Sequence, residues 1–166
     1  PMTESEAIFV SERDSFYMAT VTSDGWPYVQ HRGGRIGFLK TLGPHTLGFA
    51  DYKGNRQLIS TGNLSSSDRV SLFLMDYPSK QRLKILGNAS VQCADEAPEL
   101  AEQLVDEADR NFVERVFLIE VLSYDWNCPK YITPRYSKAE VGEVIVPLKE
   151  RITSIEETIR ELKEKQ

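Results

Sequence analysis

Three short groups of residues in the first two-thirds of the chain concentrate cations, and two of them also contain glycine and amide residues. They are Gln30-His31-Arg32-Gly33-Gly34, Lys53-Gly54-Asn55-Arg56 and Arg82-Leu83-Lys84. Each group falls at a predicted strand end or turn. Arginine and lysine bind phosphate through charge-assisted hydrogen bonds, and glycine lets the backbone approach a ligand closely. Together the groups favour a pocket for a planar cofactor that carries a phosphate.

The phosphate of such a cofactor requires two or more cationic side chains. Arg56 is predicted at the start of a helix, and Arg32 at the end of a strand. Arg82 and Lys84 are two residues apart on a strand and therefore share one face. Taken alone, the pair of Arg82 and Lys84 is better explained as ordinary solvent-facing charge, and so is Arg56 at a helix start. Their joint occurrence with the glycine pair favours an anion site.

The ring of the cofactor would need backbone contacts and hydrogen bonds at its edges. Gly33-Gly34 removes side chains where a strand could pass close to a ring, although a β-bulge without a ligand is an equally ordinary explanation. Gln30 and Asp51 lie where they could bond the ring edges, or else are solvent-exposed. Strand alternation predicts His31 on the opposite face from Gln30 and Arg32. His31 could donate a proton, but a lone strand histidine is usually structural.

A second unusual segment runs from Trp126 to Arg135 and is predicted to be a loop. Trp126 could flank the ring, while Lys130 or Arg135 could stabilise a reduced, anionic ring. The alternative is a packed crossover segment whose tryptophan fills the core. Both interpretations stay open. Cys128 has no resolving partner nearby, which favours an inert thiol.

The remaining pattern predicts an α+β domain with peripheral helices, built around an antiparallel barrel that takes six or seven of the expected strands. A capping box at Thr3 to Glu6 opens the first helix. The expected helices are 3–13, 55–64 and 98–110, the last capped by Asp95, and the expected strands are 16–22, 26–32, 36–40, 46–51, 69–76, 82–93, 115–124 and 141–146.

The end of the chain is different in kind. Pro147 is predicted to open a helix whose apolar residues recur at spacings of four and three. These residues are Leu148, Ile152, Ile155, Ile159 and Leu162. The stripe covers little more than two heptads, too short for an independent coiled coil. We therefore divide the chain into a barrel domain, 1–146, and a helix, 147–166, that docks on the body or on a partner chain.

Composition bounds the function further. The 166 residues suit one domain, and a net charge of −5 argues against general nucleic-acid binding. No apolar run approaches a membrane span and no signal pattern precedes the domain, so we expect a cytoplasmic protein without a membrane partner. Cys93 and Cys128 are expected to be free thiols. His31 and His45 are the only histidines, which argues against a metal site.

These residues resemble the pyridoxamine 5′-phosphate oxidase-like, FMN-binding split-barrel superfamily, and most closely its branch of predicted flavin-nucleotide-binding proteins. The similar segments are 16–21, 27–34, 49–56, Asn63-Leu64, 69–72, 82–84 and 126–135. The resemblance covers residues 16 to 146 and implies an antiparallel split β-barrel.

The resemblance also implies a homodimer with two FMN sites at the interface. Arg56, Arg82 and Lys84 would hold the phosphate, the strand from Gln30 to Gly34 the ring, and the segment 126–135 would come from the other chain. The cofactor-binding residues predicted in this way are Gln30, His31, Arg32, Gly33, Gly34, Asp51, Asn55, Arg56, Asn63, Arg82, Lys84, Trp126, Lys130 and Arg135.

Two departures from the family pattern bear on the activity. The namesake enzyme has a serine-arginine-lysine run where this chain has Gly54-Asn55-Arg56, so one basic contact is missing. Its late arginine and histidine pair, which holds the substrate, has no counterpart because no histidine follows His45. Both departures argue against vitamin B6 oxidation.

The leading hypothesis is an FMN-dependent oxidoreductase acting on an unidentified small molecule. No residue stands out as a substrate-specific acid or base, so the catalytic residues are unknown. The alternatives are a flavin carrier or sensor without turnover, a split barrel that binds a deazaflavin or haem, and a cofactor-free interaction domain built around the final helix.

Overall fold

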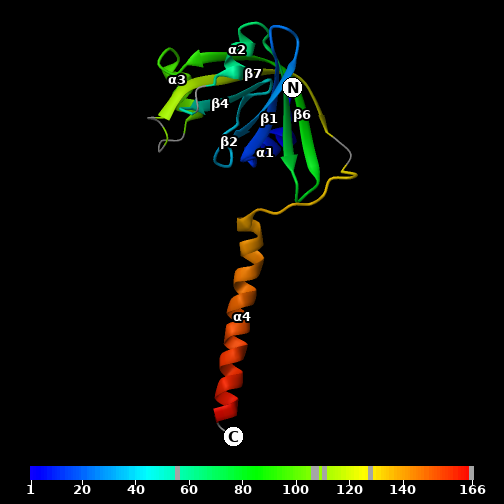
Figure 1. Cartoon of the computed structure of the whole chain (residues 1–166), viewed down its shortest axis with the longest axis vertical. Helices are drawn as coiled ribbons and strands as arrows, with labels where there is room; N and C mark the ends of the chain where they lie inside the picture. The colour runs from blue at the N-terminus through cyan, green and yellow to red at the C-terminus, as the bar shows by residue number, and fades with distance from the viewer. Residues whose placement is uncertain (55–56, 106–108, 110–111, 127–128, 165–166) are drawn as a thin grey trace.

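The computed structural model describes residues 1–54, 57–105, 109, 112–126 and 129–164. It contains a β-domain and one long helix that extends away from it (Figure 1). The strands are β1 (Ser15–Val21), β2 (Pro27–Gly33), β3 (Lys40–Gly43), β4 (Thr46–Tyr52), β5 (Arg69–Asp76), β6 (Gln81–Cys93) and β7 (Val113–Trp126). The helices are α1 (Glu4–Ser11), α2 (Ile59–Leu64), α3 (Pro98–Leu104) and α4 (Lys138–Glu164).

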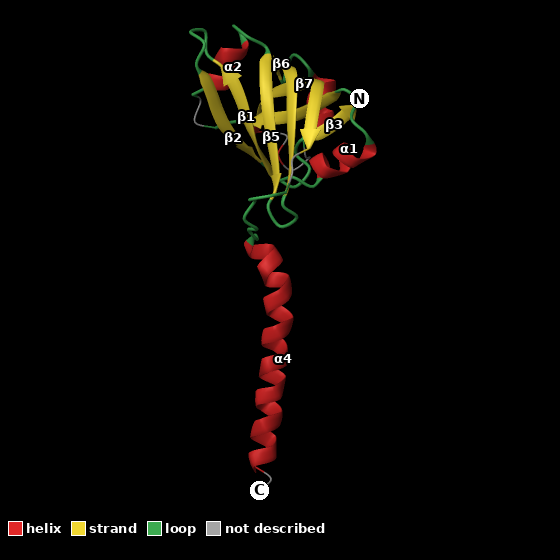
Figure 2. Ribbon diagram, turned by 90° about the vertical axis from the view of Figure 1, so that its right-hand side faces the viewer, coloured by secondary structure: helices red, strands yellow, loops and turns green. Residues whose placement is uncertain are grey.

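The strands form a single antiparallel sheet in the order β2-β1-β5-β6-β7-β4-β3 (Figure 2). Its curvature encloses an apolar core, as a split barrel requires. The predicted α+β class and antiparallel split β-barrel are therefore confirmed. None of the described helices is long and apolar enough to cross a membrane.

Aromatic rings fill the centre of this core. Phe49 on β4 stacks on Phe117 of β7 with ring centroids 4.7 Å apart, and it meets the edge of Phe16 on β1 at 5.4 Å. All three side chains are fully buried. Because they come from distant parts of the sequence, their contact holds the two ends of the sheet together.

β5 follows the predicted bounds, Arg69 to Asp76, and only one of its faces is fully buried. Its inward residues Val70, Leu72 and Leu74 are buried, whereas the outward residues between them are only half-buried. The same alternation continues on its neighbour β6, where Leu83 and Ile85 face the core. The outer face of the sheet is therefore only partly buried along β5 and β6.

Several predicted boundaries are wrong. The strand expected at residues 36–40 begins only at Lys40, because Gly37 has a positive φ of 80° and its amide bonds the Arg13 carbonyl in a turn. α2 begins at Ile59 instead of Asn55. α3 begins at Pro98 as predicted, but its cap is Ala97 instead of Asp95 and it ends at Leu104. Residues 55 and 56 lie outside the described residues.

The strand predicted at residues 141–146 is also wrong, because these residues belong to α4. The β-branched valines favoured a strand, but a capping box upstream decides the conformation. The Ser137 amide donates to the Glu140 carboxylate at 2.6 Å, and the Glu140 amide donates to the Ser137 hydroxyl at 3.2 Å. The helix therefore begins at Lys138, nine residues before Pro147, which lies in its interior.

The capping box predicted at the first helix is present, and its Glu6 side chain also bonds Trp126, the last residue of β7. The buried Glu6 carboxylate accepts hydrogen bonds from the Thr3 amide at 2.8 Å and from the Trp126 indole at 2.7 Å. Burial alone would raise the pKa of Glu6. Hydrogen bonds from Thr3, Trp126 and Tyr124 outweigh burial and lower this pKa from 4.5 to about 2.

This arrangement predicts acid sensitivity. A depressed folded-state pKa contributes stability above the unfolded value of 4.5, and that stability is lost as pH falls from about 4.5 towards about 2. Glu6→Gln removes the titrating group while keeping an acceptor, so its urea midpoint should change less with pH over this range. Parallel pH profiles for the wild type and Glu6→Gln, from pH 7 to 2.5, would contradict the assignment.

Candidate functional site

The alternation of β2 separates the predicted site residues onto two faces of the sheet. Gln30 and Arg32 point inwards and are partly buried, while His31 between them is exposed on the outer face. The His31 ring meets Tyr17 of β1 at a centroid distance of 5.6 Å. The face assignments predicted for this strand are confirmed, and they place His31 away from Gln30 and Arg32.

Arg82 and Lys84 share the outer face of β6, as their spacing predicted. The guanidinium of Arg82 lies over the Phe73 ring at 5.4 Å, and the Lys84 ammonium pairs with Asp125 at 2.5 Å. Arg32 lies on the inner face and three strands away, roughly 14 Å at the usual strand spacing. The predicted convergence of these cations with Arg32 on one anion is therefore wrong within a single chain.

Arg32 instead belongs to a polar cluster on the inner face. Its guanidinium contacts one carboxylate oxygen of Asp51 at 2.7 Å, and Arg115 contacts the other at 2.9 Å. Arg115 also pairs with Glu114 at 3.0 Å. Arg32, Asp51 and Arg115 are each only 12–16% exposed in their side chains. Arg115 was not among the predicted site residues, because only the pairing of β4 with β7 places it opposite Asp51.

A small polar cavity of about 140 Å³ lies against this cluster. β2, β4, α2 and β7 all contribute to its wall, and the Ser60 hydroxyl donates to the Gln30 side-chain oxygen at 2.8 Å. Gly54 and Leu58, which flank residues 55–56 in the sequence, also line the cavity. Three predicted residues, Gln30, Arg32 and Asp51, are thus brought together.

The cavity suits an anionic group. Arg32 Nε is buried and has no hydrogen-bond partner among the described residues, although buried donors are almost always paired. Its guanidinium is held over Phe117 at 5.1 Å. The described lining has two guanidinium groups and one carboxylate. The volume exceeds the roughly 30 Å³ share of one water several-fold, enough for a phosphate but not for a three-ring system.

The glycine pair has an internal explanation. A Cβ at Gly34 would lie 2.6 Å from the Phe38 ring, and one at Gly33 would lie 3.0 Å from the His31 ring. β2 pairs with β1 through Gly33 without a change of register and ends there, so the glycine pair ends the strand and does not form a bulge. These glycines make room for side chains of the same chain. Nearby, the buried Asn63 amide donates to Thr20 at 2.9 Å and fastens α2 to β1.

The contacts made by the described residues from Trp126 to Arg135 support the alternative of a packed crossover segment. Trp126 is the last residue of β7 instead of a loop residue, and its ring meets Phe9 edge-on at 4.8 Å. The Arg135 guanidinium lies over Tyr77 at 5.1 Å, and Lys130 lies near Tyr131. Within one chain, Trp126 and Arg135 do not line the cavity at Arg32. Residues 127 and 128 lie outside the described residues.

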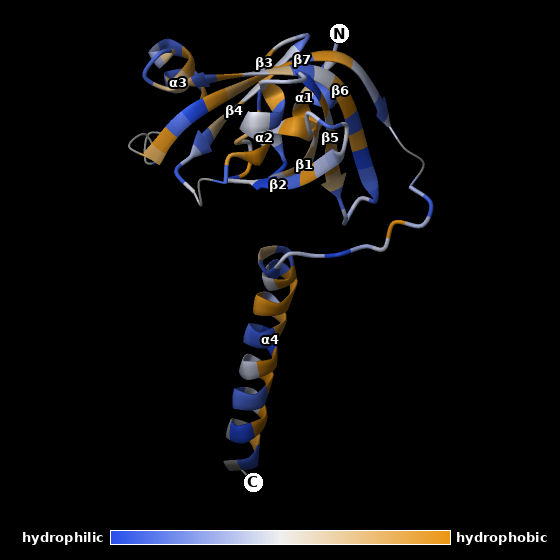
Figure 3. Ribbon diagram, turned by 45° about the horizontal axis from the view of Figure 1, so that its top comes forward, coloured by the Kyte–Doolittle hydropathy of each residue, from blue (hydrophilic) through white to orange (hydrophobic). Residues whose placement is uncertain are grey.

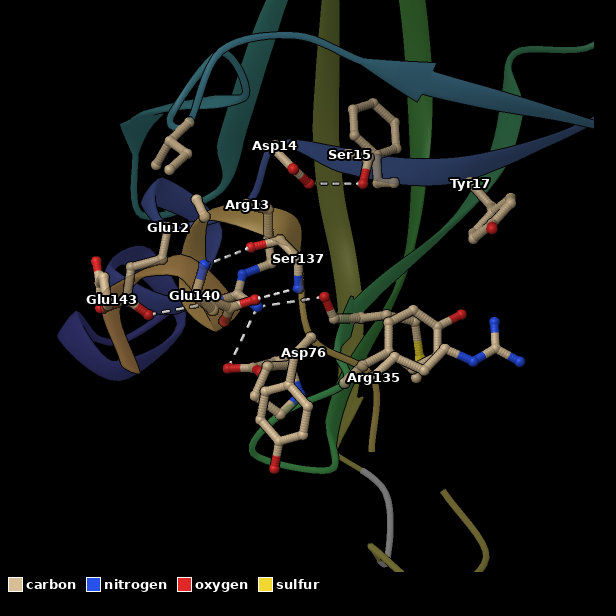
Figure 4. A pocket seen from close by; sticks show the side chains of 17 residues that line it. Glu12, Arg13, Asp14, Ser15, Tyr17, Asp76, Arg135, Ser137, Glu140 and Glu143 are labelled. Atoms are coloured by element: carbon tan, nitrogen blue, oxygen red, sulfur yellow. Dashed lines mark hydrogen bonds and ion pairs between the residues drawn. The ribbon is translucent and has the colours of Figure 1, made fainter. Parts of the chain in front are cut away.

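A larger cavity of about 490 Å³ lies between the β-domain and the start of α4. Figure 4 shows Glu12, Glu140 and Glu143 close together at its rim. Inside it, Arg13 pairs with Asp76 at 3.3 Å. Carboxylates outnumber cations among its lining residues, so this cavity disfavours a phosphate despite its size.

Comparison with solved structures supports the fold. A putative pyridoxamine 5′-phosphate oxidase from Lactobacillus delbrueckii is 22% identical, with a TM-score of 0.56 over 75% of this chain and 93% of its own. An FMN-binding protein from Syntrophomonas wolfei is 11% identical, with a TM-score of 0.50 over 74% and 82%. The haem storage protein HutZ from Vibrio cholerae is 15% identical, with a TM-score of 0.52 over 74% and 92%.

At these identities the solved structures show the fold alone. The comparison with curated proteins gave no match. The sequence itself is more decisive, because residues 2–125 match the family model described as pyridoxamine 5′-phosphate oxidase. That match spans most of the chain and nearly the whole β-domain. The chain belongs to the pyridoxamine 5′-phosphate oxidase family.

Proposed function

We propose that this protein binds FMN and is an FMN-dependent oxidoreductase acting on a small molecule. The observation that carries the proposal is the cavity at Arg32, a space of phosphate size lined by Arg32 and Arg115, beside a buried Arg32 donor that has no partner among the described residues. The family match supports a flavin, and the fold is shared with an FMN-binding protein.

In this proposal the chain's own residues hold the phosphate end of the cofactor. Arg32 donates through Nε, and Arg115 adds a second positive charge across the cavity. Asp51 bonds both guanidinium groups and fixes their orientation. Arg56 follows Gly54 in the sequence and is proposed as a further contact. When bound, the flavin supplies hydride and electron transfer, and the protein supplies binding and orientation.

We further propose a homodimer in which the phosphate of the cofactor lies in the inner-face cavity at Arg32 and its ring reaches the interface past the edge strand β2. The outer face of the sheet carries a row of apolar and small side chains in register across four strands: Val29, Ala19, Ser71 and Leu86. Val29 is 60% and Leu86 55% exposed. The neighbouring row includes His31, Tyr17 and Lys84. A second copy would cover these rows and bring its segment 126–135 to the ring.

Visible absorption tests this proposal. The purified protein is dialysed and titrated separately with FMN, with a deazaflavin (F420) and with haemin, and the FMN complex is then treated anaerobically with NADH or NADPH. Saturable FMN binding with bleaching supports the proposal. FMN binding without bleaching by NADH or NADPH would leave a carrier, or an enzyme with another electron donor. Selective binding of F420 or haemin would overturn the choice of FMN.

A further inference from the structure

α4 presents an unpartnered apolar seam along its whole length. Figure 3 shows hydrophobic residues following one side of the helix. The seam consists of Val141, Ile145, Leu148, Ile152, Ile155, Ile159 and Leu162. These side chains are 41–58% exposed, so the β-domain does not cover them. Their spacing alternates strictly between four and three residues.

The seam follows a heptad repeat over more than three heptads. Taking Ile145 as position a, the three a positions within the seam, 145, 152 and 159, are isoleucine, and Lys138 occupies the a position at the start of α4. Position d is Val141, Leu148, Ile155 and Leu162. A sustained 3.5-residue period predicts a left-handed coiled coil, and β-branched residues at a with leucine at d favour two parallel strands. Because α4 begins at Lys138 and not at Pro147, the seam is longer than the two heptads expected from the sequence.

Charges beside the seam fit a second copy of the same helix. In a parallel pair, a g position of one helix faces the e position of the next heptad on its partner. Arg151 at g would face Glu156 at e, twice by symmetry. The residues three and four positions from Arg151 on its own helix are all uncharged, so an intrahelical partner is not available at those positions. The other g positions, Val144 and Thr158, face lysines without like-charge repulsion.

Pro147 is compatible with this pairing. It occupies a c position, on the side of the helix turned away from the seam. The proline ring and the missing amide therefore do not interfere with the side chains that pack in the seam. A membrane surface fits less well, because glutamates outnumber lysines and arginines between residues 138 and 164.

We infer that α4 pairs with α4 of a second copy in a parallel, in-register two-stranded coiled coil. This inference concerns the helix alone and requires neither a bound cofactor nor the outer-face interface proposed above. The pairing aligns the two β-domains at the same end of the coil.

Self-crosslinking tests orientation and register in the full chain without added flavin. Cys93 and Cys128 are first replaced by serine. Leu162→Cys at d should then form an intermolecular disulfide under mild oxidation, whereas Arg160→Cys at b should not. An antiparallel pair would leave Leu162→Cys unlinked and would link the double variant that also carries Ile145→Cys. Either that result or a failure of Leu162→Cys to link overturns the inference.

Sedimentation tests whether the seam holds the copies together. Ile152→Asp should weaken self-association at least about tenfold, because it places a charge in the seam, while Ser154→Asp on the outer side should not. Arg151→Glu should weaken it, and Glu156→Arg in the same chain should restore it. A dimer unaffected by Ile152→Asp would overturn the coiled coil and leave the outer-face dimer standing. Wild-type monomers that co-sediment with phosphatidylserine vesicles would also overturn it.

Discussion

Replacing Arg32 with glutamate is expected to weaken FMN binding by at least about 100-fold. A hydrogen bond to a charged group contributes about 1.5–3 kcal/mol, and each 1.4 kcal/mol is about tenfold in affinity. Charge reversal adds repulsion from the phosphate and from Asp51, which lies 2.7 Å from the Arg32 guanidinium. Quenching of FMN fluorescence during titration measures the change.

Two comparisons make this result specific. Arg69→Glu makes the same charge change at an exposed strand start outside the cavity and should leave affinity within about twofold, since isolated surface charges contribute little. Lys84→Glu tests the outer face of the sheet. If Lys84→Glu releases FMN and Arg32→Glu does not, the phosphate binds on the outer face and the proposed cavity is wrong.

Arg32→Glu also removes the partner of a buried carboxylate, so folding must be checked. Circular dichroism and thermal unfolding of the variant serve this purpose. Arg32→Lys keeps the charge that faces Asp51 but lacks the Nε donor that is unpaired in the structure. A folded Arg32→Lys protein with full FMN affinity would show that this donor does not bind the cofactor.

Phe49→Ala is expected to lower the free energy of unfolding by about 3–5 kcal/mol, the usual cost of deleting a fully buried phenyl ring. Phe49 is 1% exposed and contacts the rings of Phe16, Phe38 and Phe117. Its loss opens a cavity where β1, β4 and β7 meet. Because domains are typically stable by only 5–15 kcal/mol, the variant should unfold at much lower urea concentration.

Phe112→Ala provides the matched control, because this ring is 59% exposed. Surface substitutions usually change stability by less than about 0.5 kcal/mol. A change below 1 kcal/mol for Phe49→Ala, measured by urea unfolding at pH 7, would contradict the central role of this ring.

Local patterns in the sequence predicted much of the sheet. The alternation of β2 correctly placed Gln30 and Arg32 on one face and His31 on the other. The bounds of β5 were correct because its apolar run is flanked by turn residues. These features depend on neighbours in the sequence, where strand periodicity is a direct signal.

The missing parts of the site depend on contacts between distant residues. Arg115 and Asp51 are 64 residues apart, and only the pairing of β7 with β4 brings them together. At Gly34, where the sequence favoured a bulge or a ligand ring, the space is filled by the ring of Phe38. Periodicity within a strand cannot reveal which residue from another segment fills the adjacent space.

The start of α4 was a different kind of error, because its signal is local. Ser137 and Glu140 have capping-box spacing, but the valines that follow favour strands by propensity and Pro147 looked like a first helical residue. The cap outweighed propensity. As a result the seam was counted as two heptads when the helix carries more than three.

The shape of the molecule affects how its subunits should be counted. α4 has 27 residues and, at 1.5 Å per residue, is about 40 Å long. It projects away from the β-domain, so the molecule is elongated (Figure 1). A particle of this shape experiences more friction than a sphere of equal mass and elutes early in size-exclusion chromatography. Even a monomer would therefore resemble a larger assembly by elution volume, so light scattering or sedimentation equilibrium must supply the mass.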